Sequence, residues 1–392
     1  MKVAIQGCCH GDLDAIYGHV QELESKNSYT VDVLLICGDF QAVRNEQDLQ
    51  CMAVPNKYKA MKDFHKYYTG ERVAPVLTLV IGGNHEASNH LWELYHGGWL
   101  APNIYYLGHA GCVRVNGVRI AGASGIFKSH DYRLGYHESL PYDQSTMRSA
   151  YHIREFAVRK LSLLSPPRIF MSHDWPQSIE RYGDLQTLLR HKSFLRSDIE
   201  SGRLGSPPLM NLLMTLKPEW WFAAHLHTYY EATVQHAACK VRNPDEIMIG
   251  EEEEEEEEGE KGEKGEEGEV GYASTKFVAL DKCLPRRRDL MVIEVEEGTS
   301  GERGLTFDVE WLGITRAMQP WLSRTREQRG FPEEAEARRL VREAVEWVRG
   351  KVGPGQEIGR WQEFRAGDNS GQTAAVCGLV EMDNRTRDNG PI

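Results

Sequence analysis

Five short polar clusters in the first 230 residues carry side chains of the types that bind metal ions. The clusters are Cys8-Cys9-His10, Gly38-Asp39, Gly82-Gly83-Asn84-His85-Glu86, Ser172-His173-Asp174 and Ala224-His225-Leu226-His227. Each one alone has an ordinary structural explanation, because Gly-Asp is usually a turn and Asn-His is commonly a cap or a turn. Their joint occurrence, each directly after an apolar run, predicts a metal centre.

These side chains suit the hydrolysis of a phosphate ester. The reaction needs a strong nucleophile at neutral pH and relief of the repulsion from the phosphoryl oxygens. One or two divalent ions supply both, because they lower the pKa of bound water and bind those oxygens. Two ions about 4 Å apart need a bridging carboxylate, for which Asp39 is the natural candidate. Asn84 can supply an amide oxygen, and His85 can act as a general acid toward the leaving oxygen.

The apolar runs that precede the clusters are short and β-branched, which is typical of buried strands. The predicted strands are residues 2–6, 31–37, 76–81, 113–115 with 118–121, 168–171 and 219–224. Helix-compatible segments lie between them at residues 12–26, 56–68, 149–165 and 179–191. This alternation predicts a layered α/β domain over residues 1–240. Ligands bind at the carboxyl ends of the strands in open α/β sheets, and all five clusters lie there.

The acidic charge of the chain is concentrated in one segment. The 392 residues have a formal net charge of −12, and residues 251–269 hold 13 Glu and 2 Lys, so most of the charge comes from there. Such a run repels itself and buries nothing, which predicts that residues 242–272 are a disordered insert or linker. An alternative role is the recruitment of basic partners. The rest of the chain is nearly neutral, so a polyanionic ligand is not excluded.

Composition narrows the class of protein further. No apolar run approaches the ~20 residues of a membrane span, and the first residues are too short an apolar stretch for a signal peptide. The 8 cysteines are scattered through the chain, which predicts a reducing compartment and unpaired thiols.

A second, smaller part of the chain follows the insert. Residues 275–280, 290–295 and 305–312 resemble strands, and residues 333–351 have apolar side chains at helical spacing. We therefore expect a small β-containing domain over residues 273–350. Residues 353–392 are rich in Gly and polar side chains, which predicts a disordered tail.

The clusters together resemble the calcineurin-like metallophosphoesterase superfamily, whose pattern is D-x-H, G-D-x-x-G, G-N-H-D/E, H and G-H-x-H. Three positions differ, because Ala42 and Ala224 replace glycines and Cys8 replaces the first carboxylate. The resemblance implies a layered metallophosphoesterase β-sandwich flanked by helices. A thiolate favours Zn²⁺ or Fe²⁺ over Mg²⁺.

The cysteine in Gln6-Gly7-Cys8-Cys9-His10-Gly11 is similar to that of the RNA lariat debranching enzyme family. Further stretches agree with that family over about residues 1–315, apart from the acidic insert. They include Cys37-Gly38-Asp39-Phe40-Gln41, Ser172-His173-Asp174-Trp175-Pro176, Gly125-Ile126-Phe127-Lys128 and Ala279-Leu280-Asp281-Lys282-Cys283-Leu284-Pro285.

The resemblance implies a site and a reaction. One metal position would consist of Cys8, His10, Asp39 and His227, and the other of Asp39, Asn84, His173 and His225. One or two divalent ions, Fe²⁺, Zn²⁺ or Mn²⁺, would act there. The reaction would be hydrolysis of the 2′–5′ phosphodiester at the branch point of an excised intron, with His85 protonating the departing 2′-oxygen. The substrate would be branched intron RNA, and the protein would be nuclear, with spliceosome-associated or intron-turnover proteins as possible partners.

The family's lariat recognition loop would correspond to residues 124–154, and this segment also predicts RNA binding without the family. Aromatic side chains that stack on unpaired bases alternate there with cations that bind phosphates. The predicted substrate-binding residues are Lys128, Tyr132, Arg133, Tyr136 and His137. The alternative is an amphipathic surface with core aromatics. Residues 149–160 fit such a helix, so the RNA interpretation rests mainly on residues 127–148.

Two other functions are compatible with this fold. One is a different metallophosphoesterase, such as a phosphatase or a nuclease, although Cys8 and the aromatic-basic segment argue against it. The other is an interaction protein without catalysis, but such proteins usually lose metal ligands. Here every ligand position and His85 are present. The sequence does not predict the oligomeric state.

Overall fold

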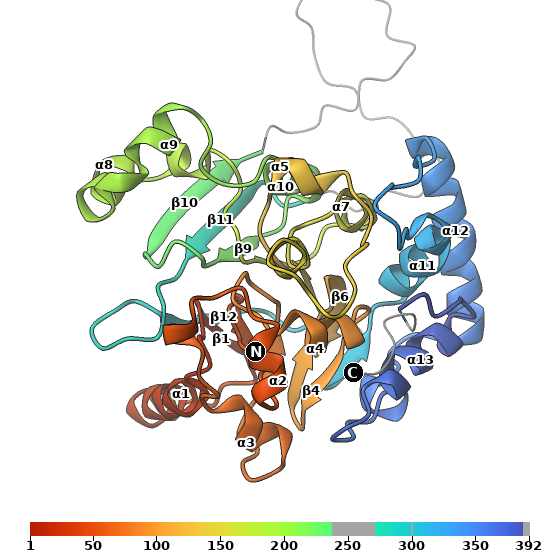
Figure 1. Cartoon of the computed structure of the whole chain (residues 1–392), viewed down its shortest axis with the longest axis horizontal. Coiled ribbons are helices and arrows are strands. Elements are labelled where there is room, and N and C mark those ends of the chain that lie inside the picture. The colour runs from red at the N-terminus through yellow and green to blue at the C-terminus, as the bar shows by residue number, and fades with distance from the viewer. Residues whose placement is uncertain (237–270, 299–300, 387–392) are drawn as a thin grey trace, which may run out of the picture.

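The structure is a computed structural model, and it describes residues 1–236, 271–298 and 301–386 (Figure 1). The acidic segment predicted at residues 242–272 lies outside the described residues up to residue 270. Two β-sheets pack face to face, and helices cover their outer faces. The predicted α/β sandwich flanked by helices is therefore confirmed.

The first sheet contains the N-terminal strands. Its strand order is β12 (Leu290–Glu294), β1 (Lys2–Gln6), β2 (Val33–Ile36), β3 (Leu77–Val80), β5 (Ile104–Tyr106) and β4 (Gly98–Ala101). Strands β1, β2 and β3 are parallel neighbours. They are buried on both faces, which explains why their sequences are continuous apolar runs without alternation.

The second sheet contains seven strands. Its order is β10 (Tyr230–Gln235), β11 (Ser274–Ala279), β9 (Trp220–Ala223), β8 (Ile169–Ser172), β7 (Val118–Ala123), β6 (Ala110–Val115) and β13 (Leu305–Phe307). Strands β6 and β7 form a hairpin whose turn residues Asn116 and Gly117 have φ of 49° and 76°. Positive φ at both positions is the geometry that an Asn-Gly turn provides, and it joins the two strands predicted at residues 113–115 and 118–121.

Three apolar layers hold the sandwich together. Ile5 and Leu35 of the first sheet pack between the sheets with Met171 and Phe222 of the second. The outer face of the first sheet packs on α1 (Leu13–Asn27) and α3 (Phe64–Tyr68). The outer face of the second sheet packs on α7 (Glu155–Ser162), α10 (Pro207–Leu216) and α11 (Val309–Met318).

The remaining helices are short, except for α12 (Glu334–Lys351), which agrees with the helix predicted at residues 333–351. The other α-helices are α2 (Glu46–Gln50), α4 (Ser88–Glu93), α5 (Ser129–Tyr132), α6 (Thr146–Ser149), α8 (Leu185–His191), α9 (Arg196–Glu200) and α13 (Ser370–Leu379). The 3₁₀ turns are η1 (Asn56–Tyr58), η2 (Ile179–Tyr182), η3 (Ser193–Leu195), η4 (Gln319–Trp321) and η5 (Ile358–Arg360). No helix among the described residues is long and apolar enough to cross a membrane.

The strands after the insert do not form a separate small sheet. Strand β11 pairs with β9, β12 pairs with β1, and β13 pairs with β6, so the C-terminal part of the chain extends both sheets. The strand predicted at residues 305–312 ends at Phe307, because Asp308 caps α11 by accepting a hydrogen bond from the backbone of Trp311.

The prediction of a disordered tail is wrong for residues 353–386. This segment contains α13, and Val376 and Val380 of this segment are buried against the first sheet. The side chain of Gln372 accepts a hydrogen bond from Trp99 N at 2.7 Å and donates one to Trp99 O at 2.9 Å. Because Trp99 lies in the edge strand β4, Gln372 takes the place of a neighbouring strand and covers the sheet edge.

Candidate metal centre

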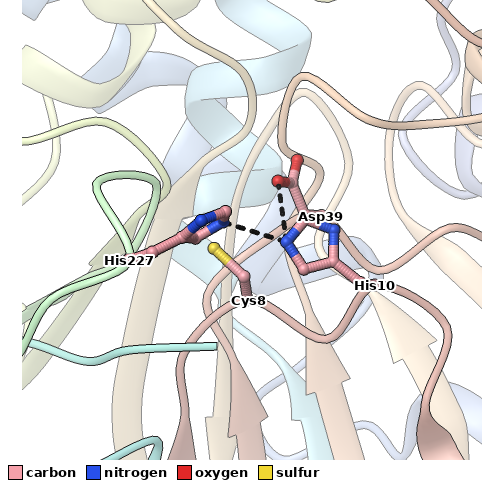
Figure 2. A group of neighbouring side chains, drawn as sticks. All are labelled: Cys8, His10, Asp39 and His227. Carbon is pink, nitrogen blue, oxygen red and sulfur yellow. Dashed lines mark hydrogen bonds and ion pairs between the residues drawn. The ribbon is translucent and has the colours of Figure 1, made fainter. Parts of the chain in front are cut away.

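The loops that follow β1, β2, β3, β8 and β9 meet at one place and carry all the predicted metal ligands. One donor atom each from Cys8, His10, Asp39 and His227 lies within 4.8 Å of the others (Figure 2). We call these four residues the Cys8 group. Asp39 also contacts His173, and His173 in turn contacts Asn84 and His225; we call these four residues the His173 group.

Several of these residues adopt backbone conformations that are rare outside glycine. His10, Asp39, His225 and His227 have φ of 50°, 46°, 63° and 48°. All four lie in the loops that follow β1, β2 and β9. Such conformations cost of order 1–3 kcal/mol each and cluster at functional sites, which agrees with a ligand-binding role here.

In the Cys8 group the two histidines face each other. His10 Nε2 lies 2.9 Å from His227 Nε2 and 3.8 Å from Asp39 Oδ2 (Figure 2). The Cys8 sulfur accepts a hydrogen bond from His225 N at 3.3 Å. Burial raises the pKa of the Cys8 thiol, and the Asp39 carboxylate raises that pKa further. Sulfur, imidazole and carboxylate donors converge here as they do around a divalent transition metal.

In the His173 group the histidine is anchored to the backbone. His173 Nδ1 donates to Cys37 O at 2.8 Å, which leaves Nε2 to face Asn84 Oδ1 at 3.2 Å and Asp39 Oδ1 at 3.3 Å. Metal-binding histidines in proteins commonly donate their second nitrogen to a carbonyl in this way. The ring of His225 lies 5.0 Å from that of His173, centre to centre.

Asp39 lies between the two groups with one carboxylate oxygen toward each. Burial alone would raise the pKa of Asp39, but the facing His173, His85 and His10 outweigh that effect and hold the pKa well below its usual value. The carboxylate is therefore ionised at neutral pH. A buried carboxylate that stays ionised among imidazoles is suited to bridge two metal cations.

Glu86 holds two of the ligand loops together. Its carboxylate accepts backbone hydrogen bonds from Phe40 at 2.7 Å, Gln41 at 2.8 Å and Gly83 at 2.9 Å. Because these donors flank Asp39 and Asn84, Glu86 fixes the distance between the two loops. Sequence reasoning assigned Glu86 no role, although its position at the end of the Gly-Asn-His-Glu motif was the signal available.

Glycines allow the loops to approach this closely. A β-carbon on Gly83 would lie 2.3 Å from Asp39 Oδ1, and one on Gly38 would lie 2.4 Å from His173 Nδ1. Both distances are shorter than any van der Waals contact. Substitution of either glycine would therefore displace a predicted ligand.

His85 lies beside Asp39 but faces outward. Its backbone nitrogen donates to Asp39 Oδ1 at 2.8 Å, and its ring Nδ1 lies 3.4 Å from Asp39 Oδ2. The His85 side chain is 33% exposed, whereas that of His173 is fully buried. This placement orients the ring and leaves Nε2 as the nitrogen available to a bound substrate, as a general acid requires.

The residues present fit a divalent metal ion, because sulfur, imidazole, amide and carboxylate donors converge from five separate loops. Cys8, His10, Asp39 and His227 would hold an ion at one position, and Asp39, Asn84, His173 and His225 at the other. When bound, such an ion supplies an acidified water and charge neutralisation at a phosphoryl group. The assignment of each residue as a ligand stays a prediction.

The predicted recognition segment, residues 124–154, borders the His173 group. Asp174 Oδ2 accepts a hydrogen bond from Phe127 N at 3.0 Å, and Gly125 N donates to Gly82 O at 2.9 Å. Asp174 thus connects the strand that carries His173 to this segment. That contact was not foreseen from the sequence, which placed Asp174 only near the ligands.

The predicted RNA-binding side chains of this segment differ in exposure. Lys128 and Arg133 are exposed, and His137 is half-buried. Tyr132 is half-buried against Phe127, with ring centres 5.5 Å apart.

Tyr136 is the exception among these side chains. It is only 3% exposed and packs among Trp92 and Tyr95, so its prediction as a base-stacking residue is wrong.

The fold and the site together define a calcineurin-like phosphoesterase, a class that uses divalent metal ions, and the sequence model of that family, "Calcineurin-like phosphoesterase", matches residues 1–229. A second family model, "Lariat debranching enzyme, C-terminal domain", matches residues 272–385. The chain is 46% identical over 353 residues to a lariat debranching enzyme of Arabidopsis thaliana, which covers 90% of this chain and 76% of that protein. It therefore belongs to the lariat debranching enzyme family, as its sequence motifs predicted.

Animal relatives are similar at the same level. The chain is 51% identical over 334 residues to the lariat debranching enzyme of Gallus gallus, covering 85% of this chain and 57% of that protein. For the lariat debranching enzyme of Homo sapiens the identity is 51% over 334 residues, covering 85% and 56%. The chain thus spans little more than half the length of these animal relatives.

Proposed function

We propose that this protein hydrolyses the 2′–5′ phosphodiester bond at the branch point of excised intron lariats and so linearises them for turnover. The observation that carries the proposal is the position of His85, which is oriented by Asp39 at the joint edge of both ligand groups yet remains open to solvent. The names of the relatives, each a lariat debranching enzyme, support the choice of substrate.

The residues of the site have separate roles in this reaction. Asp39 orients His85 through its contact with Nδ1, and His85 Nε2 gives its proton to the 2′-oxygen that departs. Asp174 keeps the recognition segment against the site, where the exposed Lys128 and Arg133 contact RNA phosphates.

The metal is Fe²⁺, Zn²⁺ or Mn²⁺ in this proposal. The thiol of Cys8 replaces the carboxylate that a harder ion prefers, which favours Fe²⁺ or Zn²⁺ over Mg²⁺. The protein would act in the nucleus, where intron RNA is released, together with spliceosome-associated or intron-turnover proteins.

The test is hydrolysis by the purified protein of three substrates: a branched RNA, a linear 3′–5′ RNA of the same sequence, and a phosphopeptide. We expect cleavage of the branched RNA alone, at the 2′–5′ bond. Equal activity on linear RNA or on the phosphopeptide would instead identify another phosphoesterase of this class.

His85→Ala separates chemistry from metal binding in the same assay. We expect it to keep its metal, measured by elemental analysis, and to lose about 10²–10⁴-fold in turnover, the range for a general acid. His236→Ala is the matched control and should cleave like the unsubstituted protein, because His236 bonds Thr275 and none of the predicted ligands. Full activity of His85→Ala would remove His85 from the mechanism.

A further inference from the structure

The loop between β11 and β12, residues 280–289, belongs to the C-terminal part of the chain and reaches the metal centre. Cys283 N donates to Cys8 O at 3.4 Å, and a β-carbon on Gly7 would lie 2.0 Å from Asp281 O. The loop therefore packs directly on the end of β1, where the Cys8 group begins. Neither sequence motifs nor the proposed mechanism gives it a role.

This loop carries four cations in seven residues. Lys282 is half-buried, and Arg286, Arg287 and Arg288 are exposed. Arg287 pairs with Asp281 at 3.3 Å, and Arg288 stacks on the ring of Tyr229, 3.2 Å from its centre. Lys282 and Arg286 have no acidic partner among the described residues. The loop thus presents uncompensated positive charge beside the ligands.

Lys282 lies close to the Cys8 group itself. The backbone of the next residue, Cys283, bonds the backbone of Cys8, so Lys282 lies one residue from that contact. An ammonium group in that place suits a substrate phosphate that approaches the Cys8 group.

A second segment adds an exposed aromatic ring. Lys192 caps the end of α8; burial lowers its pKa, and the nearby charges of Arg287 and Lys282 lower it further while Asp281 opposes them. Lys192 Nζ lies 5.9 Å from the ring centre of Phe194, and Phe194 is 72% exposed. In Figure 1 the loop extends outward on the left, the side of the molecule that carries α8. Exposed aromatics interleaved with cations are typical of surfaces that bind single-stranded nucleic acid.

We propose that Lys192, Phe194, Lys282, Arg286 and Arg287 form a second RNA-binding surface, which holds the single-stranded RNA that continues from the branch point past the Cys8 group. The inference rests on the proposed function. A branch point joins three RNA strands, so RNA leaves the site in more than one direction. The 124–154 segment, attached to the His173 group, binds one of these RNA strands, and the second surface binds another.

Equilibrium binding of a labelled linear single-stranded RNA of about 15 nucleotides tests the surface without requiring cleavage. The variant Lys282→Gln/Arg286→Gln/Arg287→Gln should raise Kd about tenfold at 0.1 M salt. It should also flatten the dependence of log Kd on log salt by about 2, since each phosphate contact contributes about 0.7 for a single strand. The triple variant Arg338→Gln/Arg342→Gln/Arg349→Gln removes the same charge from exposed positions of α12, on the right of Figure 1, and should bind almost as the parent does.

Phe194→Ala should weaken binding about tenfold with no change in the salt dependence, because stacking releases no counterions. Trp361→Ala, an exposed aromatic beside α13, is its control and should bind as the parent does. Equal effects of the loop and α12 variants, or no effect of either, would overturn the proposal. Thermal melting of each variant checks that these exposed substitutions leave the fold intact.

The two proposals fail in different ways. If the loop variant loses RNA affinity while the parent protein does not cleave branched RNA, the surface stands and the debranching function falls. If the parent cleaves branched RNA and the loop variant binds like the parent, the function stands and this surface falls.

Discussion

The two ligand groups share Asp39, yet they are supported differently. In the His173 group, His173 Nδ1 is fixed by the carbonyl of Cys37, which belongs to a strand end and cannot rotate away. In the Cys8 group, the Nδ1 of His10 meets only the side-chain nitrogen of Gln41 at 3.3 Å, and its Nε2 faces His227. The first arrangement is preorganised, and the second depends on side chains that can adjust.

The two groups also differ in their donor atoms. The Cys8 group contains a sulfur and two imidazoles, whereas the His173 group contains an amide oxygen in place of the sulfur. Soft donors select Zn²⁺ or Fe²⁺, and oxygen donors accept harder ions. The comparison therefore indicates one position that is geometrically rigid and one that is chemically selective, joined by a single carboxylate.

Asp39→Asn is the strongest way to break this comparison, because it removes the charge that both groups share at nearly constant volume. We expect loss of metal from both positions and a fall in turnover larger than the 10²–10⁴-fold expected for a general acid alone. The readouts are elemental analysis and cleavage of branched RNA. Asp174→Asn is the control and should retain its metal, since Asp174 bonds Phe127 and not the ligands. Normal metal content in Asp39→Asn would show that Asp39 is not a bridge.

Glu86→Gln tests whether the Glu86 carboxylate fixes the distance between the loops that carry Asp39 and Asn84. The amide nitrogen of glutamine would face a backbone N–H, so at least one of the hydrogen bonds from Phe40, Gln41 and Gly83 would be lost. We expect metal affinity to fall about 10–100-fold, the range for residues that support metal ligands.

Metal titration measures the effect of Glu86→Gln. Glu180→Gln replaces a glutamate that is equally buried in η2 and should leave metal affinity unchanged. An unchanged affinity in Glu86→Gln as well would mean that the two loops keep their distance without it.

The convergence of the candidate ligands could be predicted from the sequence because each follows a short apolar run typical of a buried strand. Parallel strand ends meet at one edge, so the topology alone brings Cys8, Asp39 and Asn84 together. The motif position of Glu86 signals that this residue matters but not what it bonds, because its partners are backbone N–H groups that every residue has. Their positions depend on the folded turns, with the positive φ values of Asp39 and Gln41 among them.

Composition misled the prediction in two places. The tail looked disordered because Gly and polar residues dominate it, but a few side chains, such as Gln372 and Val376, carry its contacts with the first sheet. In the 124–154 segment the alternation of aromatics and cations predicts a surface and a core equally well. Only the structure shows that Tyr136 belongs to the core while Lys128 is exposed.

Cys8→Asp sharpens the chemical difference between the groups. Replacing the thiol by a carboxylate should move the metal preference toward Mn²⁺ or Mg²⁺, measured as the ratio of activities with each ion after chelation and reconstitution. Asn84→Asp adds a carboxylate to the His173 group, where oxygen is already a donor, and should shift the preference less. If the preference of Cys8→Asp equals that of the parent, Cys8 does not bind the metal.

The smallest expected effect is a difference of about one proton released on metal binding, between the parent protein and Cys8→Asp. Burial and the Asp39 carboxylate raise the pKa of the Cys8 thiol, so the thiol keeps its proton at neutral pH until a metal displaces it. Metal affinity should therefore gain about tenfold per pH unit from this group as the pH rises, and the gain should be smaller in Cys8→Asp, because the ordinary pKa of a carboxyl group lies about 4–5 units below that of a thiol. Calorimetry in buffers of different ionisation enthalpy counts the released protons, and the variant should release about one fewer. Identical proton release by the two proteins would show that the Cys8 thiol does not bind the metal.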